Sequence, residues 1–194
     1  QWAAVWWISL SITTVSSGFL VLGISRLSPG LSAMLSATMP LFTALIAVAV
    51  IAEFPGRRGY FGLLIGLFGA VFLAVPAFGS GNTTLGIIFL LISSVSWAAG
   101  AVLNKRLPGA LQISPLMLVA LQITFSAGCL HLAVPFFEDW SETSFTWGLA
   151  MPLLYAGIPS LAVTFYLFAS VLRRAPAVQA AAVAYLTPFF GVIF

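Results

Sequence analysis

Seven long runs of apolar residues, separated by short polar breaks, make up most of the sequence. Their approximate bounds are Trp2–Leu22, Gly30–Ile51, Gly59–Phe78, Leu85–Asn104, Ile113–Pro135, Trp147–Leu172 and Ala177–Phe194. Most runs have about the 20 residues that an α-helix needs to cross the ~30 Å hydrocarbon core of a bilayer. A transmembrane strand would show about ten residues of alternating apolar and polar side chains, which the runs do not. The sequence therefore predicts an all-α, polytopic integral membrane protein.

Composition indicates that these runs face lipid rather than the core of a soluble domain. Charged residues are 6% of the chain and apolar residues are 61%, whereas a soluble domain carries about a quarter charged residues. The few Lys and Arg residues form no basic patch, so nucleic acid is not an expected partner. The single cysteine, Cys129, excludes an intrachain disulfide and a thiolate metal site, and no cofactor or metal is expected. We expect a multi-pass protein of the cell (inner or plasma) membrane, in contact with the lipid bilayer.

From the two ends of the sequence we expect the chain to be a piece of a longer protein. The chain begins at Gln1, without a methionine, and stops at Phe194 inside an apolar run. No basic segment followed by a small-residue cleavage site precedes the first run, so no signal peptide is predicted. We expect further membrane segments on both sides.

The polar breaks between the runs alternate in charge. Three of them carry basic pairs, Arg57-Arg58, Lys105-Arg106 and Arg173-Arg174. The alternate breaks contain Arg26, the neutral segment 79–84 and the acidic residues Glu138, Asp139 and Glu142. The positive-inside rule places the three basic pairs on the cytoplasmic face. Glu53 lies near the same face, and we expect it to pair with Arg57 or Arg58.

Two prolines within apolar runs, Pro40 and Pro188, are 148 residues apart. The same shift carries Arg26 onto Arg174, Ala33 onto Ala181 and Phe42 onto Phe190. The two copies are five spans apart and must cross the membrane in opposite directions, as in the inverted repeats of secondary transporters. We expect each proline to kink its helix, as a hinge or cavity wall or as a static kink. Thr38 and Thr187 are candidates to satisfy the carbonyl groups that the prolines free.

Three stretches, taken together, contain small residues, prolines and a glutamate in a specific order. The first runs Ser28-Pro-Gly-Leu-Ser-Ala-Met-Leu-Ser-Ala-Thr-Met-Pro-Leu-Phe42, then to Glu53, Arg57-Arg58 and the run Gly59–Val75. The second runs from Leu85-Gly-Ile through Ser96-Trp97-Ala-Ala-Gly100 to Asn104-Lys-Arg106, and the third from Tyr166 through Ala175-Pro-Ala177 to Pro188. In this order they resemble the EamA-type repeat of the drug/metabolite transporter superfamily.

This resemblance implies a helical bundle of ten helices, arranged as two inverted five-helix repeats. Residues 1–78 would form the last three helices of the first repeat, and residues 79–84 an outer linker. Residues 85–194 would form the first four helices of the second repeat. Seven of the ten spans would then be present in this chain.

The fourth run carries most of the candidate solute-binding residues. Ser93, Ser96, Trp97, Gly100 and Asn104 recur at helical spacing and share one face. Trp97 lies near the midplane, where an interfacial aromatic belt does not explain it. We expect a central cavity lined by Trp97, Ser93, Asn104, Tyr166, Tyr185 and Gln122. The alternative for this polar face is a seam that joins two helices.

Two further features have open interpretations. Gly59, Gly62, Gly66 and Gly69 leave one face of the third run without side chains, which permits the close approach of another backbone. We expect a helix of the same chain there, with a homo-oligomer contact as the alternative. His131 lies near the outer end of its run, so we expect an interfacial residue rather than a proton relay.

The favoured function is export of small metabolites, such as amino acids or related solutes, by alternating access. The direction and the solute class follow from the resemblance. Absence of charge in the middle of the runs favours neutral or zwitterionic solutes. The alternatives are a nucleotide-sugar or phosphate-ester carrier, which would be expected to place Arg or Lys in the spans, and a non-transporting scaffold subunit. An enzyme is not expected, because Cys129 and His131 lie on different faces of one helix.

Overall fold

The fold is known from a computed structural model that describes residues 2–74, 84–106, 113–136 and 146–186. Every element within these ranges is helical. In chain order they are α1 (Trp2–Ser9), the π-helix η1 (Leu10–Val15), α2 (Ser16–Ile24), α3 (Pro29–Ser36), α4 (Met39–Ile51), α5 (Arg57–Ala74), α6 (Thr84–Arg106), α8 (Pro115–Ala133), the 3₁₀-helix η3 (Val134–Phe136), α9 (Trp147–Tyr155), the π-helix η5 (Ala156–Val163), α10 (Thr164–Leu172), α11 (Ala177–Ala181) and the 3₁₀-helix η6 (Ala182–Tyr185).

Five helical stretches among the described residues are long and apolar enough to cross a membrane. They are Val5–Ile24, Pro29–Ile51, Thr84–Arg106, Pro115–Phe136 and Trp147–Leu172. The chain is thus an all-helical, multi-pass membrane protein, as its composition predicts. The third predicted run forms α5, which is not among the five. The seventh begins with α11 and runs into residues 187–194, which lie outside the described part of the chain.

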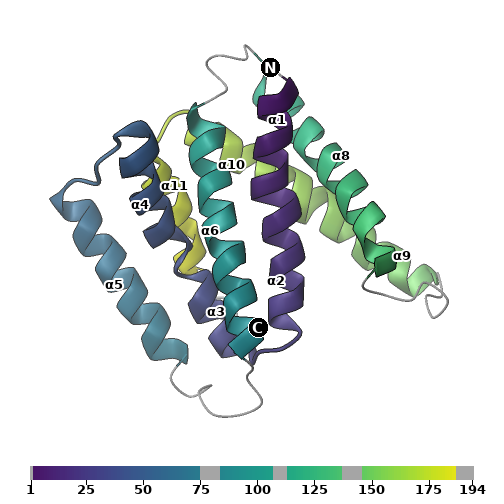
Figure 1. Cartoon of the computed structure of the whole chain (residues 1–194), viewed down its shortest axis with the longest axis horizontal. Coiled ribbons are helices and arrows are strands. Elements are labelled where there is room, and N and C mark those ends of the chain that lie inside the picture. The colour runs from purple at the N-terminus through teal and green to yellow at the C-terminus, as the bar shows by residue number, and fades with distance from the viewer. Residues whose placement is uncertain (1, 75–83, 107–112, 137–145, 187–194) are drawn as a thin grey trace.

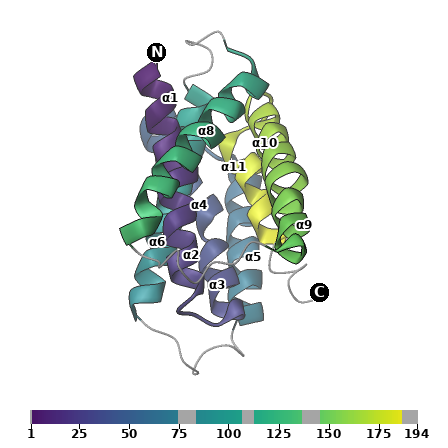
Figure 2. The same cartoon turned by 90° about the vertical axis from the view of Figure 1, so that its right-hand side faces the viewer.

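Helix α6 lies at the centre of the bundle. It packs against α1, η1, α2, α3, α4, α10 and α11, and Figure 1 shows it between α4 on one side and α2 on the other. Helix α5 lies at one edge, and α8, α9 and α10 lie toward the other (Figures 1 and 2). The largest buried cluster joins the first span, α4, α6, α10 and α11 through Ile8, Ile12, Ala47, Ala101, Val102, Leu172, Ala177 and Ala180.

The span Pro29–Ile51 is broken in its middle. Helix α3 ends at Ser36 and α4 begins at Met39. The carbonyl oxygen of Leu35 accepts hydrogen bonds from the Thr38 N–H at 3.1 Å, the Thr38 hydroxyl at 2.5 Å and the Ser94 hydroxyl at 3.2 Å. Thr38 thus satisfies a carbonyl group at the break, but it is that of Leu35 and not the Ser36 carbonyl, four residues before Pro40, that the proline would free. The expected kink at Pro40 is instead a break just before it, since Pro40 occupies the first turn of α4, where no N–H is needed. Pro188 and Thr187 lie outside the described residues.

Element boundaries recur after the 148-residue shift that relates the two prolines. Shifting α2 (16–24) by 148 gives 164–172, the bounds of α10. The same shift moves η1 (10–15) to 158–163, which lies within η5, and moves the first residue of α3 (29) to 177, the first residue of α11. In Figure 1 the chain runs in opposite directions through α1–α2 and through α9–α10.

Two glycines allow close approach between elements. A Cβ atom added to Gly100 of α6 would lie 2.4 Å from the Ile12 Cβ and 2.7 Å from the Ile12 Cα. A Cβ atom added to Gly66 of α5 would lie 2.5 Å from the Tyr185 ring. At Gly66 the glycine face of α5 is therefore covered by a side chain of the same chain, rather than by the backbone of another helix. At Gly62 and Gly69 an added Cβ would meet no described atom within 4 Å.

Gly100→Ala should destabilise the protein because the new methyl group would overlap the backbone of Ile12. Overpacking of this kind costs about 1–3 kcal/mol, and it should appear as a lower melting temperature of the detergent-solubilised protein. Gly62→Ala is the matched control: its Cβ enters open space, and the higher helix propensity of alanine contributes up to about 1 kcal/mol. A melting temperature that is unchanged by Gly100→Ala would contradict the close contact.

Candidate functional site

The polar face of α6 is a hydrogen-bonded seam over much of its length. The Ser93 hydroxyl lies 2.8 Å from the Ser16 carbonyl oxygen, to which it donates, and 3.3 Å from the Ser16 hydroxyl. The Ser96 hydroxyl donates to the carbonyl oxygen of Ser11 in the π-helix at 3.0 Å. Both bonds join α6 to the first span, so the alternative interpretation of this face, a helix–helix seam, describes Ser93 and Ser96 in this conformation.

Trp97 and Asn104 lie on the same helix in different surroundings. The half-buried Trp97 ring packs on Phe168 of α10, with ring centroids 4.9 Å apart and an interplanar angle of 45°. It also rests against the largest buried cluster. Asn104 is buried, and its Oδ1 atom has no hydrogen-bond partner among the described residues. Trp97 thus offers an apolar surface, and Asn104 offers an acceptor that the fold does not use.

The two candidate tyrosines have different environments. Tyr166 of α10 is 40% exposed. The Tyr185 hydroxyl donates to the Leu63 carbonyl oxygen at 3.1 Å, and its ring covers Gly66. Tyr185 therefore ties η6 to α5. The contacts of the described residues do not bring the six candidates into one cluster.

Gln122 is the candidate with the largest unmet hydrogen-bonding capacity. Its side chain is fully buried in α8, which packs against α1, η1 and α10. Neither its Nε2 nor its Oε1 atom has a partner among the described residues. A buried polar group without a partner costs about 1–3 kcal/mol. The amide is neutral and can both donate and accept, so it suits an uncharged polar group of a ligand.

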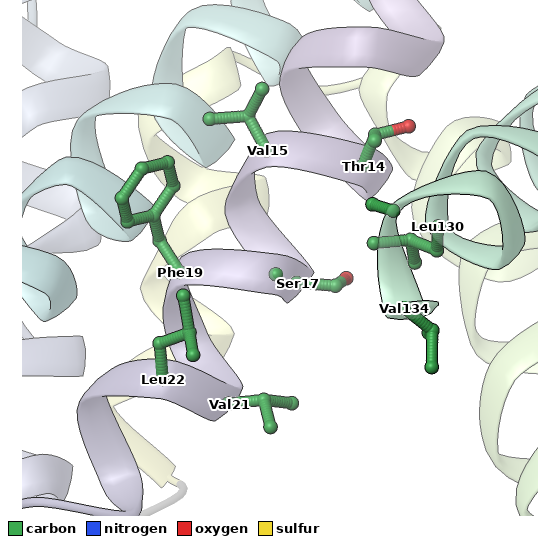
Figure 3. A pocket seen from close by; sticks show the side chains of 10 residues that line it. Thr14, Val15, Ser17, Phe19, Val21, Leu22, Leu130 and Val134 are labelled. Atoms are coloured by element: carbon green, nitrogen blue, oxygen red, sulfur yellow. The ribbon is translucent and has the colours of Figure 1, made fainter. Parts of the chain in front are cut away.

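A groove of about 430 Å³ lies between α2 and the end of α8. In Figure 3 Leu130 and Val134 face Ser17, Val21 and the neighbouring residues of the first span across it. Its lining is almost entirely apolar, apart from the hydroxyls of Thr14 and Ser17. None of the six candidate residues lines this groove. Its chemistry suits a hydrocarbon chain rather than a polar solute.

Glu53 forms a cluster of charge-assisted contacts at one end of the bundle. Its Oε2 atom pairs with the Lys105 ammonium at 2.5 Å, and its Oε1 atom accepts the Ala177 N–H at 2.6 Å. The Lys105 ammonium also donates to the Ala175 carbonyl oxygen at 3.0 Å. We call Glu53, Lys105 and the backbone of Ala175 and Ala177 the Glu53 clamp. It joins the end of α4, the end of α6 and the turn between α10 and α11.

The expected pairing of Glu53 with Arg57 or Arg58 is wrong. Helix α4 ends with Ala52 in the left-handed conformation, φ 51° and ψ 33°. The next residue, Glu53, points to α6, whereas Arg57 and Arg58 are exposed at the start of α5. Lys105 was missed as a partner, although the alternation of charge already placed it on the same side of the membrane as the carboxylate.

The profile of the EamA-like transporter family matches residues 84–194, more than half of the chain. The uncharacterized transporter YvbV of Bacillus subtilis is 23% identical over 180 residues, which cover 93% of this chain and 58% of that protein. The uncharacterized inner membrane transporter YedA of Escherichia coli is 27% identical over 194 residues, covering 96% and 60%. The chain spans about three fifths of the length of these relatives.

Ala52→Gly should stabilise the protein, because the left-handed conformation costs a residue with a Cβ atom about 1–2 kcal/mol. The greater chain entropy of glycine offsets part of this gain, about 0.5–1 kcal/mol. We expect a small rise in melting temperature. Ala49→Gly, three residues earlier and inside α4, is the control and should lower stability by about 1 kcal/mol. Equal losses at both positions would contradict the strained cap.

Proposed function

The chain belongs to the EamA-like transporter family, and from this premise we propose that it exports small neutral or zwitterionic metabolites by alternating access. Amino acids and related solutes are the proposed class. The direction and the class derive from the family resemblance; the residues of the described bundle support the choice among solutes. Proteins named as transporters among the relatives imply a small-molecule solute and a lipid environment for this chain.

The distribution of charge is the observation that carries the solute class. Among the described residues, every Asp, Glu, Lys and Arg lies at or beyond the end of a helix, namely Arg26, Glu53, Arg57, Arg58, Lys105, Arg106, Arg173 and Arg174. A carrier of nucleotide sugars or phosphate esters would need cations facing its anionic solute within the membrane. The interior instead offers the Trp97 ring and neutral amides, which suits solutes of low net charge.

Interrupted helices near the middle of the membrane support a mobile pathway. The break between α3 and α4 lies mid-span, and π-helices η1 and η5 interrupt two other spans. Discontinuous helices line the solute sites of many secondary transporters, and π-helical turns are frequent at functional sites. The recurrence of helix boundaries after 148 residues supports two repeats of opposite direction, which would rock against each other around the site.

The proposed function is tested by counterflow in proteoliposomes that contain the protein at its natural length. Radiolabelled neutral amino acids should accumulate against an excess of the same unlabelled solute inside the vesicles. Empty liposomes are the control. Saturable counterflow of a phosphorylated sugar, with no response to neutral amino acids, would overturn the solute class. Absence of counterflow for every solute class would favour the scaffold alternative.

Gln122→Leu should separate a solute contact from a structural role. Leucine has a similar size and no unsatisfied polar atoms, so the melting temperature should stay the same or rise, by up to the ~1–3 kcal/mol that the buried amide costs. Transport should nevertheless fall by about five- to tenfold, because one hydrogen bond to the solute is worth roughly 1–1.5 kcal/mol. Normal transport together with higher stability would remove Gln122 from the site.

Trp97→Ala and Tyr166→Ala should abolish counterflow while the protein stays in the membrane. Both substitutions remove aromatic surface that we assign to the solute pathway. Ser93→Ala is the matched control on α6: it should cost about 0.6 kcal/mol of stability, the usual worth of an interhelical hydrogen bond in a membrane, and leave transport intact. Normal transport by both aromatic variants would show that the cavity is elsewhere.

A further inference from the structure

We propose that the Glu53 clamp is the gate that closes the solute pathway at the end of the bundle carrying the basic pairs. This inference rests on the proposed function, since a gate has meaning only in a protein that alternates between open and closed forms. The clamp joins three segments that are 52 to 124 residues apart in the chain. Two of these segments, the end of α6 and the turn before α11, come from the second predicted repeat, and the segment with Glu53 comes from the first.

The clamp closes over tightly packed small residues. One turn below Lys105 on α6 lies Ala101, which is fully buried, as are Ala47 of α4 and Ala177 of α11. These three alanines belong to the largest buried cluster. Because their side chains are small, α4, α6 and α11 approach closely there, and all three alanines are buried between the helices. Separation of the clamp would free the ends of the same three helices.

The exposure of the ion pair suits a contact that must break and re-form. The side chains of Lys105 and Glu53 are 25% and 21% exposed. A fully buried pair leaves an uncompensated charge in a low-dielectric interior when it separates, and a fully exposed pair contributes almost nothing. A partly exposed pair holds its partners together and still lets water reach both charges as they part.

The backbone around Glu53 supports a specific role for its side chain. Ala52 holds the left-handed conformation, which residues with a Cβ atom seldom adopt. This turn directs Glu53 to Lys105 and to the first residue of α11. Both carboxylate oxygens are then occupied, one by the ammonium and one by a backbone N–H. Neighbouring Arg106 is exposed and donates a long hydrogen bond to the Val50 carbonyl oxygen, at 3.5 Å.

The gate is tested by the accessibility of a buried cysteine. In the protein at its natural length, with Cys129→Ser, the reporter Ala101→Cys is placed beneath the clamp and labelled in nanodiscs with a charged maleimide. Glu53→Gln and Lys105→Met should each raise the labelling rate about ten- to a hundredfold, the worth of a hydrogen bond to a charged group. Arg106→Met removes a charge from the next residue and should leave the rate unchanged.

A second reporter distinguishes gating from general loosening. Leu90→Cys is also fully buried on α6, about 22 Å from Lys105 along the helix, and its labelling should not change. Equal acceleration at both reporters, or none at Ala101→Cys in either variant, would overturn the gate. Failure of both variants to fold would do the same, because the clamp would then be a structural tie. Since labelling needs no solute, loss of counterflow alone would overturn only the proposed transport.

Discussion

The absence of water from the bilayer core is the constraint on which the described arrangement depends. Every break in a helix must find a hydrogen-bond partner within the protein. Helix α6 supplies several of these partners, because Ser93, Ser94 and Ser96 donate to carbonyl oxygens of two neighbouring spans. Near the first span, the hydroxyl groups of Ser93 and Ser96 can reach their carbonyl partners because Gly100 lets α6 approach the backbone of Ile12. In this bundle, close packing of the helices is therefore needed for the buried polar groups to find their hydrogen-bond partners.

The described charges lie at the ends of the helices, and one pair of them joins the two parts of the chain. Glu53 uses both carboxylate oxygens to hold the second predicted repeat against the first. The middle of the bundle holds neutral groups, among them the Gln122 amide, which has no hydrogen-bond partner among the described residues. A transporter needs this division, since contacts at an end must be breakable while groups in the middle must stay available to a solute.

The helical membrane class follows from the sequence because run length and charge are local properties. The break before Pro40 was less predictable, since an apolar stretch does not reveal whether a proline lies inside a helix or in its first turn. The π-helix in residues 10–15 was not predicted, because the polar residues of Leu-Ser-Ile-Thr-Thr-Val do not show whether the helix has an α or a π period. The partner of Glu53 depends on long-range topology, which brings Lys105 closer than Arg57. The polar face of α6 was predicted correctly, but the spacing of its residues is the same whether the face lines a cavity or joins two helices.

The π-helix η1 determines how the first span packs against two neighbouring helices, α6 and α8. An inserted residue turns everything after it by about 100° around the helix axis. Before this insertion α1 packs against both α8 and α6, and after it α2 packs against α6, while η1 touches α8 and α6. Removing one residue from Leu10–Val15 would straighten the span and rotate α2 out of phase. Ser16 would then no longer face Ser93, and α6 and α8 could not both keep their contacts with this span.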